Sequence, residues 1–266
     1  MRFAAPMADP GALLARRNPV AKLAASGVLT LALLATLDPV APALALALEL
    51  AVVPLFGVAY GTLLRRAFPI LLSAVGVVVA LGVFAAQRTG EALFAIGPLV
   101  ITTGLLNNAL GLALRVVAVA LPGVLVFAST DPTDLADALV QHLKAPARFA
   151  IGALAAFRLA PLLGAEWELL RMARRARGVD PGRNPVAHLR LFWSTAFALL
   201  VGAIRRGTRL AAAMDARGFD SGVPRTIARP QRFGAADWAL VTAAAGAAAL
   251  ALGTSLALGT FRPLLG

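Results

Sequence analysis

Residues 105–129 read LLNNALGLALRVVAVALPGVLVFAS, an apolar run whose only charged side chain is Arg115. A helix that crosses the hydrocarbon core of a bilayer needs about 20 mostly apolar residues. We therefore expect one membrane-spanning helix from Leu105 to Ser129. The apolar sequence already begins near Ala92, which leaves too little length for a second span. A short re-entrant or interfacial piece is expected around Phe94 to Thr102.

Similar apolar runs lie on both sides of this helix. They predict four more spans, at about Val20–Leu37, Val40–Thr62, Pro69–Ala86 and Ala235–Leu258. Arg16 and Arg17 before the first run could mark a signal peptide. Because further apolar runs follow at once, we favour an uncleaved first span. The count is five spans.

The composition agrees with a membrane protein. Of the 266 residues, 59% are hydrophobic and 14% are charged, and the mean hydropathy is +0.81. One soluble core cannot bury so much apolar sequence. The chain has no cysteine, which excludes disulfides and thiolate metal sites. Its two histidines, His142 and His188, lack the spacing of a zinc site.

The net charge of +12 is concentrated in one segment. Residues 144–232 hold 16 basic and 5 acidic side chains, whereas residues 1–143 hold 8 and 7. Basic loops of membrane proteins stay in the cytoplasm. The charge therefore indicates topology rather than nucleic-acid binding. It predicts a cytoplasmic N-terminus, five spans and a C-terminus outside, with the basic segment inside.

The basic segment is predicted to be helical. Thr130-Asp131-Pro132-Thr133-Asp134 is typical of a helix start, so a short interfacial helix should follow. Two long helices are expected from about Pro146 to Arg177 and from Pro185 to Arg217. Each is apolar in its first half and charged in its second. In the first long helix, Glu168 and Arg171 have the spacing of an ion pair.

Both long helices end in the same tripeptide. Ala176-Arg177-Gly178 and Ala216-Arg217-Gly218 are each followed by an aspartate two residues later. Glycine in a left-handed cap and arginine in the last turn are sufficient to explain each copy as a helix stop. The repetition also suggests two arginines that dock into an acidic or carbonyl-lined groove of a partner. Both interpretations remain open on the residues alone.

The order of several motifs resembles a known family, the EcfT/CbiQ transmembrane T components of energy-coupling factor (ECF) transporters. The resemblance covers most of the chain. It rests on the paired Ala-Arg-Gly tripeptides and on Asn18-Pro19-Val20-Ala21-Lys22, Asp38-Pro39, Arg65-Arg66, Thr130-Asp131-Pro132-Thr133-Asp134-Leu135, Phe157-Arg158-Leu159-Ala160-Pro161-Leu162-Leu163 and the stretch from Arg205-Arg206 to Ala211-Ala212-Ala213-Met214-Asp215-Ala216-Arg217-Gly218-Phe219. Asp215 stands where the family more often has glutamate.

The resemblance implies a non-catalytic subunit of an ABC-type importer in the bacterial cytoplasmic membrane. The two long helices would be coupling helices that seat Arg177 and Arg217 in two ABC ATPase subunits. A separate membrane S component would bind the cargo, which in this family is a vitamin, a vitamin precursor, or a cobalt or nickel ion. No cofactor is implied.

The expected fold class is thus an all-α membrane protein with about five transmembrane helices, and with cytoplasmic coupling helices inserted before the last span. The corresponding regions are an N-terminal membrane region at 1–129, a coupling-helix region at 130–232 and a last span at 233–266. The chain has no Gly-Lys-Ser/Thr sequence, so ATP hydrolysis must come from a partner.

Two charged residues inside predicted spans provide an alternative. Glu49 and Arg115 are functional candidates, because charges inside a membrane are costly. A stand-alone permease could bind its own substrate through them. A membrane-embedded enzyme is a weaker possibility, since the chain has no paired acids at catalytic spacing and no nucleophile motif. Glu49 could also be a neutral structural residue, and Arg115 could lie near the interface.

Overall fold

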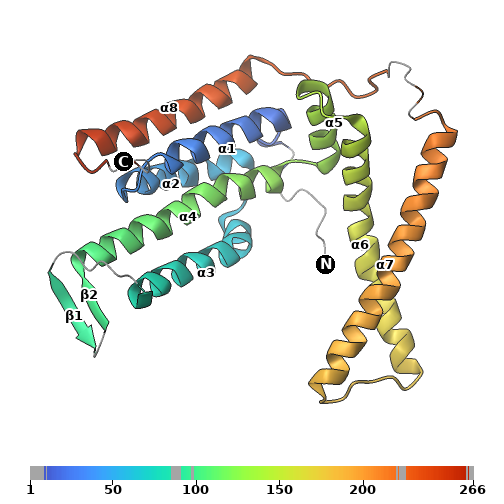
Figure 1. Ribbon diagram of the computed structural model, residues 1–266. Coiled ribbons are helices and arrows are strands. Elements are labelled where there is room, and N and C mark those ends of the chain that lie inside the picture. The colour runs from blue at the N-terminus through green and yellow to red at the C-terminus, as the bar shows by residue number, and fades with distance from the viewer. Residues whose placement is uncertain are drawn as a thin grey trace. The chain divides into compact units, whose positions relative to one another are not determined.

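Helices form almost the whole of the described protein. The computed structural model describes residues 9, 11–84, 91–96, 99–219, 221, 226–261 and 263. Its elements, in chain order (Figure 1), are α1 (Pro19–Leu34), α2 (Val40–Val52), the 3₁₀ helix η1 (Val53–Phe56), α3 (Tyr60–Phe84), strands β1 (Ala92–Ile96) and β2 (Leu99–Thr102), α4 (Thr103–Ser129), α5 (Pro132–His142), α6 (Ala147–Ala176), α7 (Pro185–Ala216) and α8 (Ala235–Ala257).

The chain divides into two compact units. Pro6–Lys144 and Gln231–Gly266 form one unit, which contains α1 to α5 and α8. Ala145–Pro230 forms the other, which contains α6 and α7. We call them the bundle unit and the helix-pair unit. The functional division into membrane and coupling regions stays a prediction.

Small residues form much of the core of the bundle unit. In it, α1 packs against α8 and α4, α2 packs against α4 and α8, and α3 packs against α4. One buried cluster consists mainly of alanines, namely Ala41, Ala45, Ala118 and Ala251 with Leu33. Such residues let helix backbones approach closely, as is usual between membrane helices. At Gly111 a methyl group would lie 3.3 Å from backbone atoms of Pro39, a tight contact that a larger residue could make only if the neighbouring backbone shifted.

The predicted fold class is confirmed, since five helices among the described residues are long and apolar enough to span a membrane. These are α3, α4, α6, α7 and α8. Their identity differs from the prediction, because α6 and α7 meet the criterion whereas α1 and α2 are only 16 and 13 residues long. The predicted long helices at 146–177 and 185–217 and the last span at 235–258 match α6, α7 and α8 closely.

The span predicted from Val40 to Thr62 is wrong in its second half. The α-helix ends at Val52 and continues only as the short 3₁₀ helix. Pro54 has no backbone N–H with which to extend the helical hydrogen bonds. Gly57, with φ at 68°, then turns the chain. These two signals lie within apolar sequence, which hides them from a hydropathy argument.

The next span begins earlier than predicted. We expected its start at Pro69, but α3 begins at Tyr60 and contains Pro69 in its interior. Membrane helices tolerate proline in this position because neighbouring groups satisfy the freed carbonyls. The predicted end at Ala86 lies outside the described residues.

The interfacial piece predicted around Phe94 to Thr102 is an antiparallel hairpin. Ala92 pairs with Thr102 and Ile96 pairs with Leu99. The side chain of Thr102 then caps α4, since its hydroxyl accepts the Leu105 N–H at 3.3 Å. The hairpin thus leads directly into the helix predicted from residues 105–129.

Two polar residues at the start of α1, the N-cap Asn18 and Lys22, connect distant parts of the bundle unit. The ammonium group of Lys22, which is 2% exposed, donates to the carbonyls of Ala15 at 2.8 Å and Ser129 at 2.9 Å. The backbone N–H of Asn18 donates to the Asp237 carboxylate at 2.9 Å. The end of α4 and the start of α8 therefore meet beside the start of α1.

We predict that Lys22→Met lowers the free energy of unfolding by about 2 kcal/mol, because buried carbonyl oxygens lose a charged donor. The free energy can be measured by denaturant titration of the detergent-solubilised protein. Lys144→Met is the matched control, since Lys144 is exposed and is the only other lysine of the chain. Equal stability of the two variants would contradict the structural role of Lys22.

The topology of α6 and α7 can be tested with single cysteines, because the natural chain has none. Arg183→Cys, at an exposed site between α6 and α7, should react with an impermeant maleimide only from the cytoplasmic side. Ile227→Cys should behave the same way, and Leu37→Cys should react from outside. Labelling of Arg183→Cys from outside would mean that α6 and α7 cross the membrane.

Candidate docking site on two helix ends

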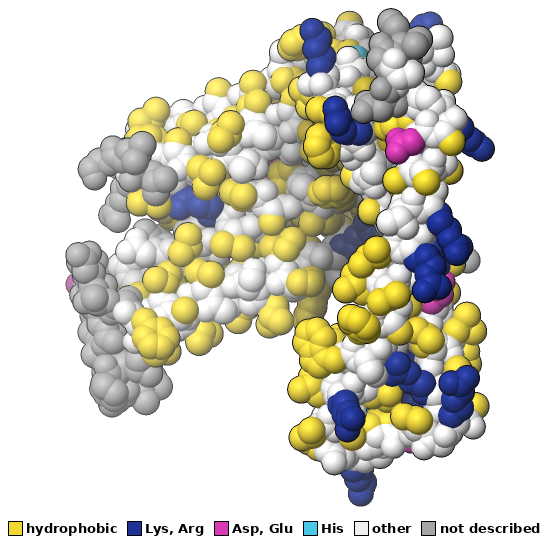
Figure 2. Space-filling model, turned by 45° about the vertical axis from the view of Figure 1, so that its right-hand side comes forward, with side chains coloured by type: hydrophobic (Ala, Val, Ile, Leu, Met, Phe, Trp, Pro, Cys, Tyr) yellow, Lys and Arg dark blue, Asp and Glu magenta, His cyan; other side chains and the backbone are white. Residues whose placement is uncertain are grey.

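The helix-pair unit presents apolar side chains on its surface. Among the described residues, α6 has no buried residue and α7 has only Thr195. Phe149, Trp193 and Phe197 are 70%, 63% and 67% exposed. Figure 2 shows hydrophobic side chains and basic side chains gathered on the same surface of this unit. Such an apolar surface requires lipid or another protein to cover it.

Polar contacts join α6 to α7. Arg174 of α6 donates to the carbonyl of Leu191 at 3.2 Å and to the hydroxyls of Ser194 at 2.6 Å and Thr195 at 2.7 Å. Each of these groups belongs to α7. The guanidinium therefore binds three acceptors on the opposite helix. One of them is the hydroxyl of Thr195, the buried residue of α7.

An ion pair also joins the two helices. Arg206 of α7 forms a bidentate pair with the Glu166 carboxylate of α6. The rings of Trp167 and Phe192 lie 5.3 Å apart and add an apolar contact. The ion pair predicted within α6 is also present, with Arg171 3.4 Å from Glu168. The contacts between the helices were not predicted, because only the antiparallel fold brings their residues together.

The carboxyl end of α6 is a Schellman motif. The N–H of Val179 donates to the carbonyl of Arg174 at 3.0 Å, and the N–H of Gly178 donates to that of Arg175 at 2.9 Å. Gly178 has φ at 75°, which favours glycine. Arg177 is the C-cap residue of this turn, and its side chain is exposed.

The carboxyl end of α7 has the same structure. The N–H of Phe219 donates to the carbonyl of Met214 at 3.1 Å, and the N–H of Gly218 donates to that of Asp215 at 2.9 Å. Gly218 has φ at 72°. Arg217 is the C-cap, with φ −91° and ψ 10°, and is also exposed. The two Ala-Arg-Gly tripeptides are therefore equivalent in backbone structure as well as in sequence.

The caps do not use the arginine side chains. Backbone N–H groups satisfy the terminal carbonyls, and glycine provides the left-handed conformation. Neither Arg177 nor Arg217 forms a side-chain hydrogen bond or ion pair with any residue that the structure describes. Because the chain folds back between the helices, these two ends lie at opposite ends of the pair (Figure 1). Both guanidinium groups are accessible to a partner.

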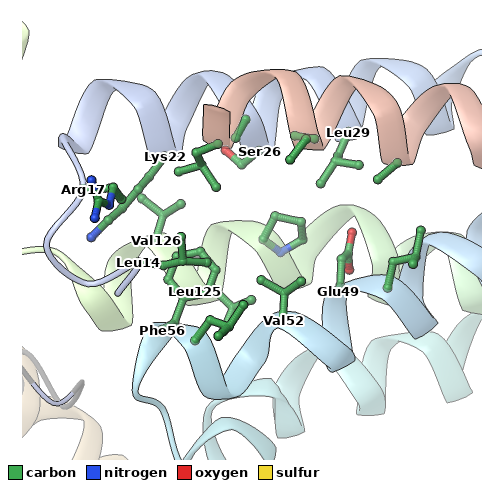
Figure 3. Close-up of a pocket in the computed structure, with 18 of the residues that line it drawn as sticks. Leu14, Arg17, Lys22, Ser26, Leu29, Glu49, Val52, Phe56, Leu125 and Val126 are labelled. Carbon is green, nitrogen blue, oxygen red and sulfur yellow. The ribbon is translucent and has the colours of Figure 1, made fainter. Parts of the chain in front are cut away.

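Glu49 and Arg115, the two candidates for a permease site, have different surroundings. Glu49 is a lining residue of a cavity among α1, α2, α4 and α8 (Figure 3), and Arg115 is absent from that lining. Arg115 donates instead to the carbonyl of Leu33 at 3.1 Å. The structure does not combine them in one site.

Asp38 explains part of the Asp-Pro motif between α1 and α2. Burial of its carboxyl opposes ionisation, but hydrogen bonds from Thr36, Ser255 and the Ala41 N–H outweigh it and lower the pKa of Asp38. The Thr36 and Ala41 bonds measure 2.6 and 3.0 Å. The motif caps the start of α2. Among the described residues no acidic or histidine cluster could hold a metal ion.

These features define a class, a multi-pass helical membrane protein that carries a long, largely uncovered helix pair with two equivalent arginine ends. The chain belongs to the CbiQ family, described as cobalt transport protein, whose profile matches residues 11–227. The resemblance stated from the motifs is thereby confirmed.

Individual relatives share about a third of the aligned residues. The chain is similar to the energy-coupling factor transporter transmembrane protein EcfT of Limosilactobacillus fermentum, at 32% identity over 59% of this chain and 61% of the relative. The proteins of the same name from Leuconostoc gelidum and Bacillus subtilis are each 31% identical, over 50% and 52% of this chain. The matched part spans about half of those two relatives, 53% and 55%.

We predict that Arg206→Ala loosens the helix pair, because Glu166 loses its partner on α7. Spin labels on Leu169→Cys and Ala211→Cys, both at exposed positions, would report the distance between α6 and α7 by pulsed electron resonance. The distance distribution should broaden. Arg205→Ala, at the exposed neighbouring position, should leave it unchanged. Identical broadening in both variants would show that the ion pair does not hold the helices.

Proposed function

We propose that the protein is the transmembrane coupling subunit of an ECF-type ABC importer. In this role it connects two ATPase subunits to a membrane S component that binds the cargo. The single observation that carries the proposal is the pair of equivalent helix ends with accessible Arg177 and Arg217. Membership of the CbiQ family and similarity to EcfT proteins support it.

Two separate docking points suit two ATPase subunits. Helices α6 and α7 contain 30 and 32 residues, so each is about 45 Å long at 1.5 Å per residue. Arg177 and Arg217 can therefore engage different subunits at the same time. Arginine suits this contact because its guanidinium stays charged and donates hydrogen bonds in a planar fork.

The clamps between α6 and α7 make the pair suitable for transmitting motion. Arg174 binds α7, and Arg206 binds α6. With the Arg174 hydrogen bonds and the Arg206–Glu166 ion pair in place, a displacement of either docked end moves the opposite helix as well. The exposed apolar side chains of the pair could then pass that motion to the S component.

The cargo belongs to the classes expected of the family, a vitamin, a vitamin precursor or a transition-metal ion. The permease alternative has less support, because Arg115 does not line the cavity that Glu49 lines and binds the Leu33 carbonyl instead. The proposed location is the bacterial cytoplasmic membrane with the N-terminus inside. Some of the basic side chains in residues 144–232 could also bind anionic lipids, at about 1 kcal/mol per residue.

Purification of the assembled complex tests the role as a whole. The chain should co-purify with two ABC ATPase subunits and one small integral membrane protein when expressed with its neighbouring genes. Reconstituted vesicles should take up cargo only when all partners and ATP are present. Transport by this chain alone would overturn the coupling role and favour the permease.

We predict that Arg177→Ala combined with Arg217→Ala abolishes ATP-driven uptake and leaves membrane insertion intact. Each single variant should lose only part of the uptake, because the two docking points share the contact. Lysine substitutions should restore uptake poorly, since lysine lacks the planar fork. Uptake is measured in reconstituted vesicles, and co-purification of the ATPases provides the binding readout.

Nearby arginines supply the control for this experiment. Arg175→Ala and Arg209→Ala remove equally exposed charges from the same two helices without changing a C-cap residue. They should retain uptake. If the double variant at Arg177 and Arg217 also retained it, the tripeptides would be helix caps only.

A further inference from the structure

A cavity in the bundle unit combines an apolar wall with one buried carboxyl group. Its volume is about 460 Å³, within the range of roughly 300–1,000 Å³ typical of small-molecule sites. Helices α1, α2, α4 and α8 line it, and α8 contributes mainly alanines, Ala236, Ala239, Ala243, Ala244 and Ala247. The helix-pair unit contributes no lining residue, so the cavity is separate from the proposed docking site.

Glu49 is the acidic residue of this lining. It is 7% exposed, and neither carboxyl oxygen has a hydrogen-bond partner among the described residues. Figure 3 shows its carboxyl group projecting from α2 into the space between the helices. A buried polar group without a partner is unfavourable, and an unpaired buried charge is more so. The Glu49 carboxyl group therefore lacks a stabilising partner among the described residues.

The other polar side chains of the lining are engaged elsewhere. The Lys22 ammonium binds the carbonyls of Ala15 and Ser129 and also contacts the hydroxyls of Ser129 and Thr130. Ser26 donates to the carbonyl of Leu23 at 2.9 Å, and Arg17 Nε donates to that of Leu13 at 3.0 Å. None of these bonds reaches Glu49. The described residues therefore leave both carboxyl oxygens of Glu49 without a hydrogen-bond partner.

We propose that this cavity binds an apolar molecule that carries one ammonium group, with the ammonium paired to Glu49. The two free carboxyl oxygens can accept hydrogen bonds from an ammonium, which is a cation with several donors. The alanine wall of α8 and the side chains of Leu125 and Val126 contact the apolar body. A single carboxyl is too few ligands for a metal ion, and the described residues supply no second one nearby.

The apolar space and the single carboxyl group of the cavity together favour an amine over other membrane molecules. A plain acyl chain would fill the apolar space but leave Glu49 without a donor. A fatty acid or other anion would place like charge beside an ionised Glu49. An apolar amine fills the space and supplies the donor in one molecule, which satisfies both features of the cavity.

The test uses the full-length protein in nanodiscs of phosphatidylcholine, with adamantylammonium as probe and adamantanol as its neutral analogue. Binding is measured by equilibrium dialysis against empty nanodiscs, which corrects for partition into lipid. We expect saturable binding of the ammonium compound. Adamantanol should compete at least about tenfold more weakly, because hydrogen bonds to a charged group contribute more than neutral ones.

Two variants separate the charge of the site from its volume. Glu49→Gln keeps the size of the side chain and removes its charge. It should weaken binding of the ammonium compound about tenfold and leave the affinity for adamantanol nearly unchanged. Ala243→Leu fills part of the cavity and should weaken the binding of both compounds. Glu168→Gln, at an exposed carboxylate of α6, is the control, and it should change the affinity for neither compound.

Two results would overturn the proposal. Binding of the ammonium compound no stronger than to empty nanodiscs would mean that the cavity holds no such ligand. Equal affinity for the two compounds, unchanged by Glu49→Gln, would mean an apolar cavity without a role for the carboxyl. Thermal unfolding and gel filtration establish that each variant is folded, and Glu49→Leu serves as the second variant if Glu49→Gln is not.

Discussion

The hydrogen bonds at the start of α1 are the constraint on which the remaining structure depends. Lys22 holds the end of α4 through the Ser129 carbonyl, and Asn18 holds the start of α8 through Asp237. The Asn18 amide also donates to the carbonyl of Arg232 and to the His142 ring. A segment of about a hundred residues therefore begins and ends at one fixed place.

Backbone capping and side-chain recognition are separated at the two helix ends. Glycine and the backbone amides complete each cap, so the arginine at the C-cap position is not needed for helix termination. Selection of the same arginine at both ends then requires another cause. The favourable interaction of arginine with the helix dipole is one such cause, and the proposed docking to a partner is another.

Features encoded by neighbouring residues could be predicted from the sequence, and features that depend on distant pairing could not. The limits of α6 and α7 follow from local proline and glycine signals, and those of α8 follow from its apolar run. All three match the structure within about two residues. The same kind of signal at Pro54 and Gly57 lies within apolar sequence, so hydropathy alone predicts a second span that is too long. Asn18 and Asp237 are 219 positions apart, and Glu166 and Arg206 are 40 apart. No periodic pattern relates such residues, and only the fold brings them together.

The surface of the helix pair limits the environments in which it can be stable. Its exposed aromatic and aliphatic side chains are unfavourable in water, whereas its charged halves are unfavourable in hydrocarbon. Neither solvent alone suits the whole length of α6 and α7. A pair that lies at the membrane surface, with its apolar part covered by lipid or a membrane protein and its charged part in water, resolves this conflict.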